Sequence, residues 1–188
     1  MLVLALQTVG MQPLCAQFPD DVLQYVPMAA AVGLDYCGPT AHHPLRERIA
    51  VTATSYAALT AVAGTLKLTV REVRPDGSDS RSFPSGHAAR AFAGAELVRS
   101  EYGWPAGLGA YAVAAGVGAL RIAGDHHYAH DVLAGAAIGV LSARLAYWVL
   151  PLERKLFGWE EKGVAFSALP TYDGATRAVG VTFHALLK

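Results

Sequence analysis

The amino-acid sequence predicts an all-α fold, a bundle of five to six helices that we expect to span a membrane, followed by a short C-terminal extension. Two observations support this prediction. The 188-residue chain contains long, alanine-rich apolar stretches that exceed the length of ordinary strands, at residues 23–34, 49–66, 88–98, 105–120 and 132–149. The composition is 53% apolar and only 16% charged, and the mean hydropathy of +0.31 is high for a soluble protein.

Residues 1–20 precede the first of these helices, and we interpret them as either a signal segment or a clipped first helix. The apolar run 2–9 is too short to cross a bilayer alone, and the positive charge that usually opens a signal is lacking. Cys15 and Cys37 could form one disulfide, but their spacing does not indicate a metal site. We expect residues 21–155 to form one helical domain and residues 156–188 a C-terminal tail.

Stretches 49–66 and 132–149 are the best candidates for membrane spans. The first has no charged residue and the second has only Arg144. Stretch 88–98 carries Arg90 and Glu96, so we expect neighbouring helices to shield them. Gly135 and Gly139 are four residues apart and predict a close helix contact. Glycine, proline and polar residues predict breaks at 38–44, 75–84, 102–105 and 124–128.

The composition of the chain changes after Pro151. A charged segment is followed by residues that alternate imperfectly between apolar and polar around Asp173 and Gly174. Such alternation around a turn is typical of two paired strands, so the tail is a candidate hairpin.

The remaining polar residues cluster at the ends of the predicted helices. Lys67, Arg71 and Arg74 follow stretch 49–66, and a helix continuing through them would place all three on one face. Consecutive helices of a bundle reverse direction, so the end of that helix shares one end of the bundle with three other helix termini. Those termini carry the motif Pro84-Ser85-Gly86-His87, the residue Arg121, and the pair His127 and Asp131.

This grouping suits a phosphoryl group. Cations and the exposed N–H groups of a helix start stabilise the charge on phosphoryl oxygens. Ser85 could bond a phosphate oxygen or simply cap its helix, and Gly86 would let the backbone approach closely. Asp131 can accept the Nδ1 proton of His127 and leave Nε2 free to attack phosphorus. His87 could then protonate the leaving oxygen and activate water.

A metal site is the alternative interpretation of the same segment. His126 and His130 are four residues apart within a run that also contains Asp125, His127 and Asp131. A metal ion would be repelled by Arg121 and its cationic neighbours, so we expect no metal and no cofactor. The formal net charge is zero and the pI is about 7.1, which gives no bulk attraction for nucleic acid.

Three separated motifs of this chain resemble the type 2 phosphatidic acid phosphatase superfamily. The family pattern is K-x6-R-P, then P-S-G-H, then S-R-x5-H-x3-D. The chain matches its order and spacings with Lys67, Arg74 and Pro75, then Pro84-Ser85-Gly86-His87, then Arg121, His127 and Asp131. The departure is Leu120, which stands where the family usually has serine and would remove one hydrogen bond to the phosphate.

The resemblance implies a metal-independent phosphatase acting through a phosphohistidine. It implies that His127 is the nucleophile, His87 the general acid and Asp131 the residue that orients the nucleophile. The phosphate-binding residues would be Lys67, Arg74, Ser85, Gly86 and Arg121.

The membrane branch of this superfamily acts on lipid phosphates or pyrophosphates. By this resemblance the partners are a phosphorylated lipid and the bilayer. Basic residues flank the opposite helix ends, so we expect a multi-pass protein of a bacterial inner membrane whose active site faces the periplasm or exterior. Two alternatives stay open: a soluble secreted acid phosphatase or vanadate-dependent haloperoxidase, and a non-catalytic membrane protein that binds phosphate.

Overall fold

The computed structural model describes residues 18–159, 164–173 and 178–187, with side chains from residue 21 to residue 159. The expectations for residues 1–16, including a pairing that involves Cys15, lie outside this range. The chain forms two compact units, of which the first ends at Pro151 and the second begins at Leu152. The first unit is helical and carries all the residues predicted for the site.

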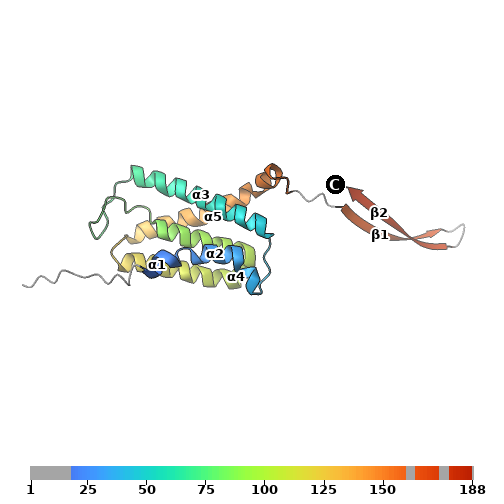
Figure 1. Ribbon diagram of the computed structural model, residues 1–188, viewed down its shortest axis with the longest axis horizontal. Helices are drawn as coiled ribbons and strands as arrows, with labels where there is room; N and C mark the ends of the chain where they lie inside the picture. Colours follow the sequence, from blue (N-terminus) through green and yellow to red (C-terminus); the bar gives the residue numbers. More distant parts are fainter. Residues whose placement is uncertain (1–17, 160–163, 174–177, 188) are drawn as a thin grey trace, which may run out of the picture. The chain divides into compact units, whose positions relative to one another are not determined.

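The helices follow the predicted apolar stretches closely (Figure 1). Short helices α1 (Phe18–Leu23) and α2 (Val26–Gly33), with a 3-10 turn (Leu34–Cys37), precede three long helices. These are α3 (Leu45–Thr69), α4 (Gly86–Ala123) and α5 (Ala129–Leu156). The predicted breaks at 38–44, 75–84 and 124–128 all fall in the non-helical connections. The all-α prediction for this part of the chain is therefore confirmed.

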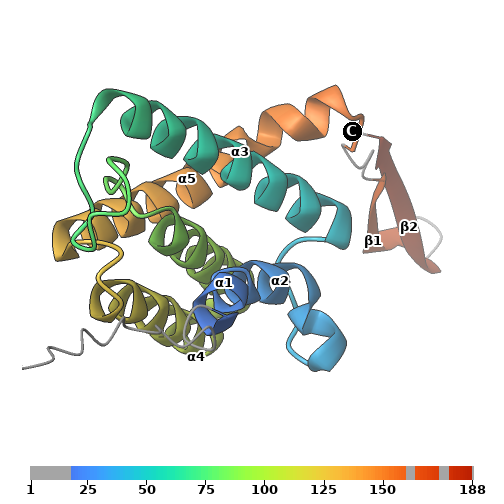
Figure 2. The same ribbon diagram turned by 60° about the vertical axis from the view of Figure 1, so that its left-hand side comes forward.

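Helix α4 is two helices that meet at a sharp bend, as the predicted break at 102–105 requires. Gly103 has φ 78° and ψ −176°, a conformation open to glycine and strained for other residues. Residues on either side of the bend face each other: the hydroxyl of Tyr111 donates to Glu96 at 2.6 Å, and Arg99 lies over the ring of Trp104. The two halves of α4 thus pack side by side (Figure 2).

The charged residues within the apolar helices are satisfied by neighbours, as predicted. Glu96 is buried, and it accepts two hydrogen bonds from Arg99, at 2.8 and 2.7 Å, and forms an ion pair with Arg144. The guanidinium Nε of Arg90 donates to Gln24 at 2.6 Å. Each pairing reduces the cost of placing a charge in an apolar helix.

Two glycines of α5 allow it to touch the first half of α4. A Cβ atom at Gly135 would collide with the carbonyl oxygen of Ser85, and one at Gly139 with that of Ala89. The predicted close contact is confirmed, and it fixes the start of α5 against the start of α4. A core contributed by α2, α3, the first half of α4 and α5 lies along the same contact.

Among the residues that the structure describes, three helices are by length and composition apolar enough to cross a membrane: α3, α4 and α5. Both stretches that we selected as spans are among them. Large apolar side chains on α5 are exposed, including Leu133 (71%), Leu141 (67%) and Trp148 (81%). Such a surface is stable in contact with lipid and costly in water.

The second unit contains the end of α5 and a two-stranded antiparallel sheet. Strand β1 (Val164–Asp173) pairs with β2 (Ala178–Leu187), so that Val164 lies opposite Leu187 and Asp173 opposite Ala178. The tail therefore has the hairpin for which its alternation made it a candidate. Residues 174–177, which include part of the predicted turn, lie outside the described range.

Candidate active site

The three basic residues Lys67, Arg71 and Arg74 do not form the helical stripe predicted from their spacing. Helix α3 ends at Thr69, and Val70 is already extended (φ −98°, ψ 106°). Arg71 is exposed, while Lys67 and Arg74 are partly buried. The prediction was wrong because it assumed that the helix continued, whereas β-branched residues and a following proline favour extended backbone here. Lys67 is the only one of the three that lies on the helix.

A loop brings Arg74 to the site instead. Its Nε donates to the Asp79 carboxylate at 2.8 Å, and its Nη1 donates to the carbonyl oxygen of His126 at 3.4 Å. The backbone N–H of Asp76 also donates to the carbonyl oxygen of Asp125 at 3.0 Å. The connection between α3 and α4 is thus tied to the connection between α4 and α5.

His127 and Asp131 form a buried pair at the start of α5. The Nδ1 of His127 lies 3.4 Å from Oδ2 of Asp131, and both side chains are almost fully buried (2% and 0% exposed). His127 precedes the helix, which begins at Ala129, so the pair spans the start of α5. The same Asp131 oxygen accepts hydrogen bonds from the Ser82 hydroxyl at 2.5 Å and the Tyr128 N–H at 2.9 Å. These bonds hold the carboxylate in place beside the imidazole.

The surroundings of His127 keep its imidazole neutral. Burial, followed by the positive charges of Arg74, Lys67 and Arg121, lowers the pKa of His127 to about 4. The charge of Asp131 acts in the opposite direction and does not compensate. A neutral imidazole has a lone pair available for attack, which a nucleophile at neutral pH requires.

The start of α4, which carries His87, is hydrogen-bonded to the start of α5 through Ser85. Ser85 is the N-cap of α4, and its hydroxyl accepts from the Ala88 N–H at 3.4 Å, which is the capping role considered above. The backbone N–H of Ser85 donates to the carbonyl oxygen of Asp131 at 3.0 Å. His87 is the second residue of α4, and its Nε2 lies 2.7 Å from a carboxylate oxygen of Asp21, which belongs to α1.

A polar cavity of about 380 Å³ lies at this end of the helices. It is lined by two arginines, Arg74 and Arg121, with His126 and with four residues that carry oxygen atoms: Asp21, Asp76, Ser78 and Asp79. The hydrogen bond from Arg74 lowers the pKa of Asp79, so this carboxylate is ionised and holds the arginine. A phosphate would therefore compete with Asp79 for Arg74. Lys67, Ser85, Gly86, His87 and His127 do not line this cavity but lie on the elements that surround it.

A family model described as the PAP2 superfamily matches residues 48–155. The chain belongs to the PAP2 superfamily. This finding confirms the resemblance that its three motifs indicate.

Two relatives extend the comparison. A lipid A 1-phosphatase from Porphyromonas gingivalis is 37% identical over 137 residues, which cover 71% of this chain and 31% of that protein. The chain thus spans about a third of the length of this curated relative. The crystal structure of LpxE from Aquifex aeolicus matches with a TM-score of 0.57 and 21% identity, over 74% of this chain and 88% of that one. The similarity to LpxE shows a shared fold.

The metal site considered from the sequence is not assembled by this PAP2 chain. His126 turns to Asp76, with Nδ1 and Oδ2 3.2 Å apart, whereas His130 turns to Glu72 at 2.8 Å. Among the described residues, Glu72, His130 and Asp131 place one ligand atom each within 4.8 Å of one another. This trio differs from the predicted set, and it shares Asp131 with the nucleophile pair.

The sequence did not indicate several residues of this region: Asp76, Ser78 and Asp79, which line the cavity, and Ser82 and Asp21, which contact predicted catalytic residues. Ser82 contacts Asp131 but lies in a loop whose course no periodicity predicts. Asp21 contacts His87 from another helix, and it lies outside the 48–155 segment matched by the PAP2 model. No local signal marks either residue, because each reaches the site only through tertiary packing.

Proposed function

We propose that this chain is a membrane-bound phosphatase that removes phosphate from a phosphorylated lipid through a phosphohistidine on His127, without a metal ion. The observation that carries the proposal is the buried contact between His127 and Asp131, surrounded by three cations. A neutral, oriented imidazole in a cationic environment suits attack on an anionic phosphorus centre.

In the first step, the lone pair of His127 Nε2 attacks phosphorus and forms the N–P bond. The bond from phosphorus to the leaving oxygen breaks, and its electron pair stays on that oxygen, which takes a proton from His87. Asp131 accepts a hydrogen bond from the Nδ1–H of His127, which keeps its proton, and the carboxylate stabilises the positive charge that the imidazole gains. Arg74, Arg121 and Lys67, with Ser85 and Gly86 at the start of α4, bind the phosphoryl oxygens.

In the second step, a water molecule attacks the phosphohistidine. His87, now neutral, accepts a proton from this water, and the N–P bond breaks with its electron pair returning to Nε2. Inorganic phosphate leaves, and the enzyme returns to its starting state. The same two histidines thus serve both halves of the reaction.

The lipid nature of the substrate rests on the membrane helices and on one relative. Three of the helices in the described part of the chain suit a bilayer by length and composition, and the Porphyromonas gingivalis relative is named a lipid A 1-phosphatase. A phosphate monoester or a pyrophosphate would fit the proposed chemistry equally well. We further propose an inner-membrane location with the site facing the periplasm. Arg46 lies at the start of α3, and Arg154 and Lys155 lie at the end of α5, which are the helix ends that do not carry site residues. Basic residues favour the cytoplasmic side of a membrane.

The test is phosphate release from lipid monophosphates, lipid pyrophosphates and water-soluble esters, in detergent with EDTA present. We expect turnover of at least one lipid phosphate by the wild-type chain and none by the variant His127→Ala. A matched control is His42→Ala, which removes an exposed imidazole in the loop before α3. Full activity of His127→Ala would refute the assignment of the nucleophile.

A further inference from the structure

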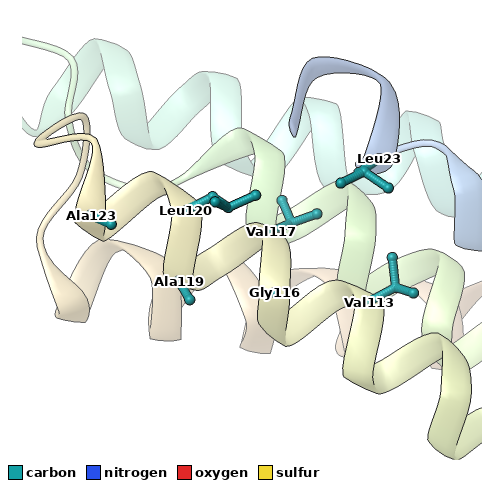
Figure 3. A pocket seen from close by; sticks show the side chains of 7 residues that line it. All are labelled: Leu23, Val113, Gly116, Val117, Ala119, Leu120 and Ala123. Atoms are coloured by element: carbon teal, nitrogen blue, oxygen red, sulfur yellow. The ribbon is translucent and has the colours of Figure 1, made fainter. Parts of the chain in front are cut away.

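An apolar groove of about 510 Å³ runs along the second half of α4 (Figure 3). Its wall consists of Leu23 from α1 and of apolar or glycine residues of α4, among them Val113, Gly116 and Leu120. From Val113 to the end of α4 the groove follows about 15 Å of helix, at about 1.5 Å per residue. Nothing in the proposed chemistry of phosphate hydrolysis uses this surface.

The groove begins beside the polar cavity. Arg121 lines the cavity and the preceding residue, Leu120, lines the groove. On α1, Asp21 lines the cavity and Leu23 lines the groove. The same two helices therefore offer a charged surface and an adjoining apolar surface. A ligand that occupies both must carry an anionic group directly connected to a hydrocarbon chain.

Leu120 is the residue that joins the two surfaces, and it stands where the family usually has serine. Its side chain is 44% exposed and points along the groove with Val117 and Leu23 (Figure 3). A serine at this position would put a hydroxyl group next to Arg121. With leucine, the apolar surface continues up to the arginine.

We propose that this groove binds an acyl chain of the substrate whose phosphate reacts at His127. The inference rests on the proposed function and extends it from the reacting group to the lipid chain. An ordinary bilayer lipid could also lie against an apolar surface, but it carries no phosphate monoester to anchor it at Arg121. The groove thus favours long-chain lipid phosphates over short or water-soluble ones.

Gly116 offers a direct test. A Cβ atom there meets nothing within 4 Å, so a leucine side chain would fill the groove without displacing its walls. Gly109 is the matched control, because it lies on the same helix two turns away, is equally open and does not line the groove. Both substitutions also raise helix propensity, which favours folding.

We expect Gly116→Leu to lower kcat/KM for a long-chain lipid monophosphate about tenfold and to leave kcat/KM for a soluble aryl phosphate unchanged. Gly109→Leu should match the wild type on both substrates. Equal kcat/KM for the two variants on the long-chain substrate would overturn the proposal. An equal loss of Gly116→Leu on both substrates would also overturn it, since the side chain would then be disturbing the catalytic residues.

A binding measurement separates this inference from the proposed hydrolysis. Gly116→Cys, in a chain with Cys15 and Cys37 replaced by serine, is labelled with a maleimide in detergent. A long-chain lipid phosphate should slow the labelling at least fivefold, whereas inorganic phosphate or the dephosphorylated lipid of equal chain length should not. Equal protection by the dephosphorylated lipid would overturn the proposal. Protection without phosphate release by the wild-type chain would uphold lipid binding and refute the hydrolysis instead.

Discussion

The effect of removing the charge of Asp131 can be calculated from its distance to His127. The variant Asp131→Asn keeps the shape of the side chain and can still accept from Ser82 and Tyr128, but it loses the negative charge 3.4 Å from His127. Attack on phosphorus makes the imidazole positive. At 3.4 Å and an effective dielectric constant of about 20, two unit charges attract each other by about 5 kcal/mol. We therefore expect kcat to fall about 10³- to 10⁴-fold, at about 1.4 kcal/mol per factor of ten.

The assay is single-turnover phosphate release in detergent, with the phosphoenzyme trapped by an alkaline quench. The variant should form phosphohistidine more slowly, because the missing charge acts on the first step. Asp125→Asn is the control: Asp125 is exposed, and its φ of 55° is one that asparagine tolerates well. The reasoning would be refuted if Asp131→Asn kept kcat within about threefold of the wild type while its thermal stability was unchanged.

Three further predictions concern neighbouring residues. Burial and nearby cations lower the pKa of His127 to about 4, so its imidazole stays neutral above that pH. The histidine NMR resonance that disappears in His127→Gln belongs to this residue, and it should titrate with a midpoint near 4. A midpoint near 6.5 would contradict this prediction. Asp21→Asn removes the charge that holds the ring of His87. We therefore expect kcat to fall about tenfold for substrates with poor leaving groups and little for substrates with good ones. An equal fall in kcat for both kinds of substrate would assign Asp21 a merely structural role. EDTA should leave activity unchanged, and Glu72→Gln and His130→Ala should do the same; inactivation by EDTA that zinc reverses would instead support a metal at this trio.

The positions of the helices follow from local properties of the sequence. Uninterrupted apolar stretches such as 49–66 favour helices, because a helix satisfies every backbone hydrogen bond within its own segment. Gly103 and Pro105 likewise mark the bend in α4 from the local preferences of glycine and proline. The number and order of the helices were enough to predict that His87, Arg121 and His127 lie at the same end of the bundle.

The positions of Arg71 and Arg74 do not follow from local properties of the sequence. Their spacing fits one helical face, yet α3 ends at Thr69 and a loop carries Arg74 to Asp79 and His126. Where a helix ends depends on the competition between continuing its hydrogen bonds and forming contacts with distant segments. A pattern of charges contains no information about those contacts.

The sequence alone predicted the helices and their order, because these depend on residue type and on spacing along one chain. It also supplied the histidines, the carboxylate and the basic residues that we propose for the site. Only the tertiary structure decided that Ser82 and Asp21 join the site and that Leu120 faces an apolar groove. These relations connect segments far apart in the chain. They result from helix packing, in which small shifts of one helix against another change which side chains meet.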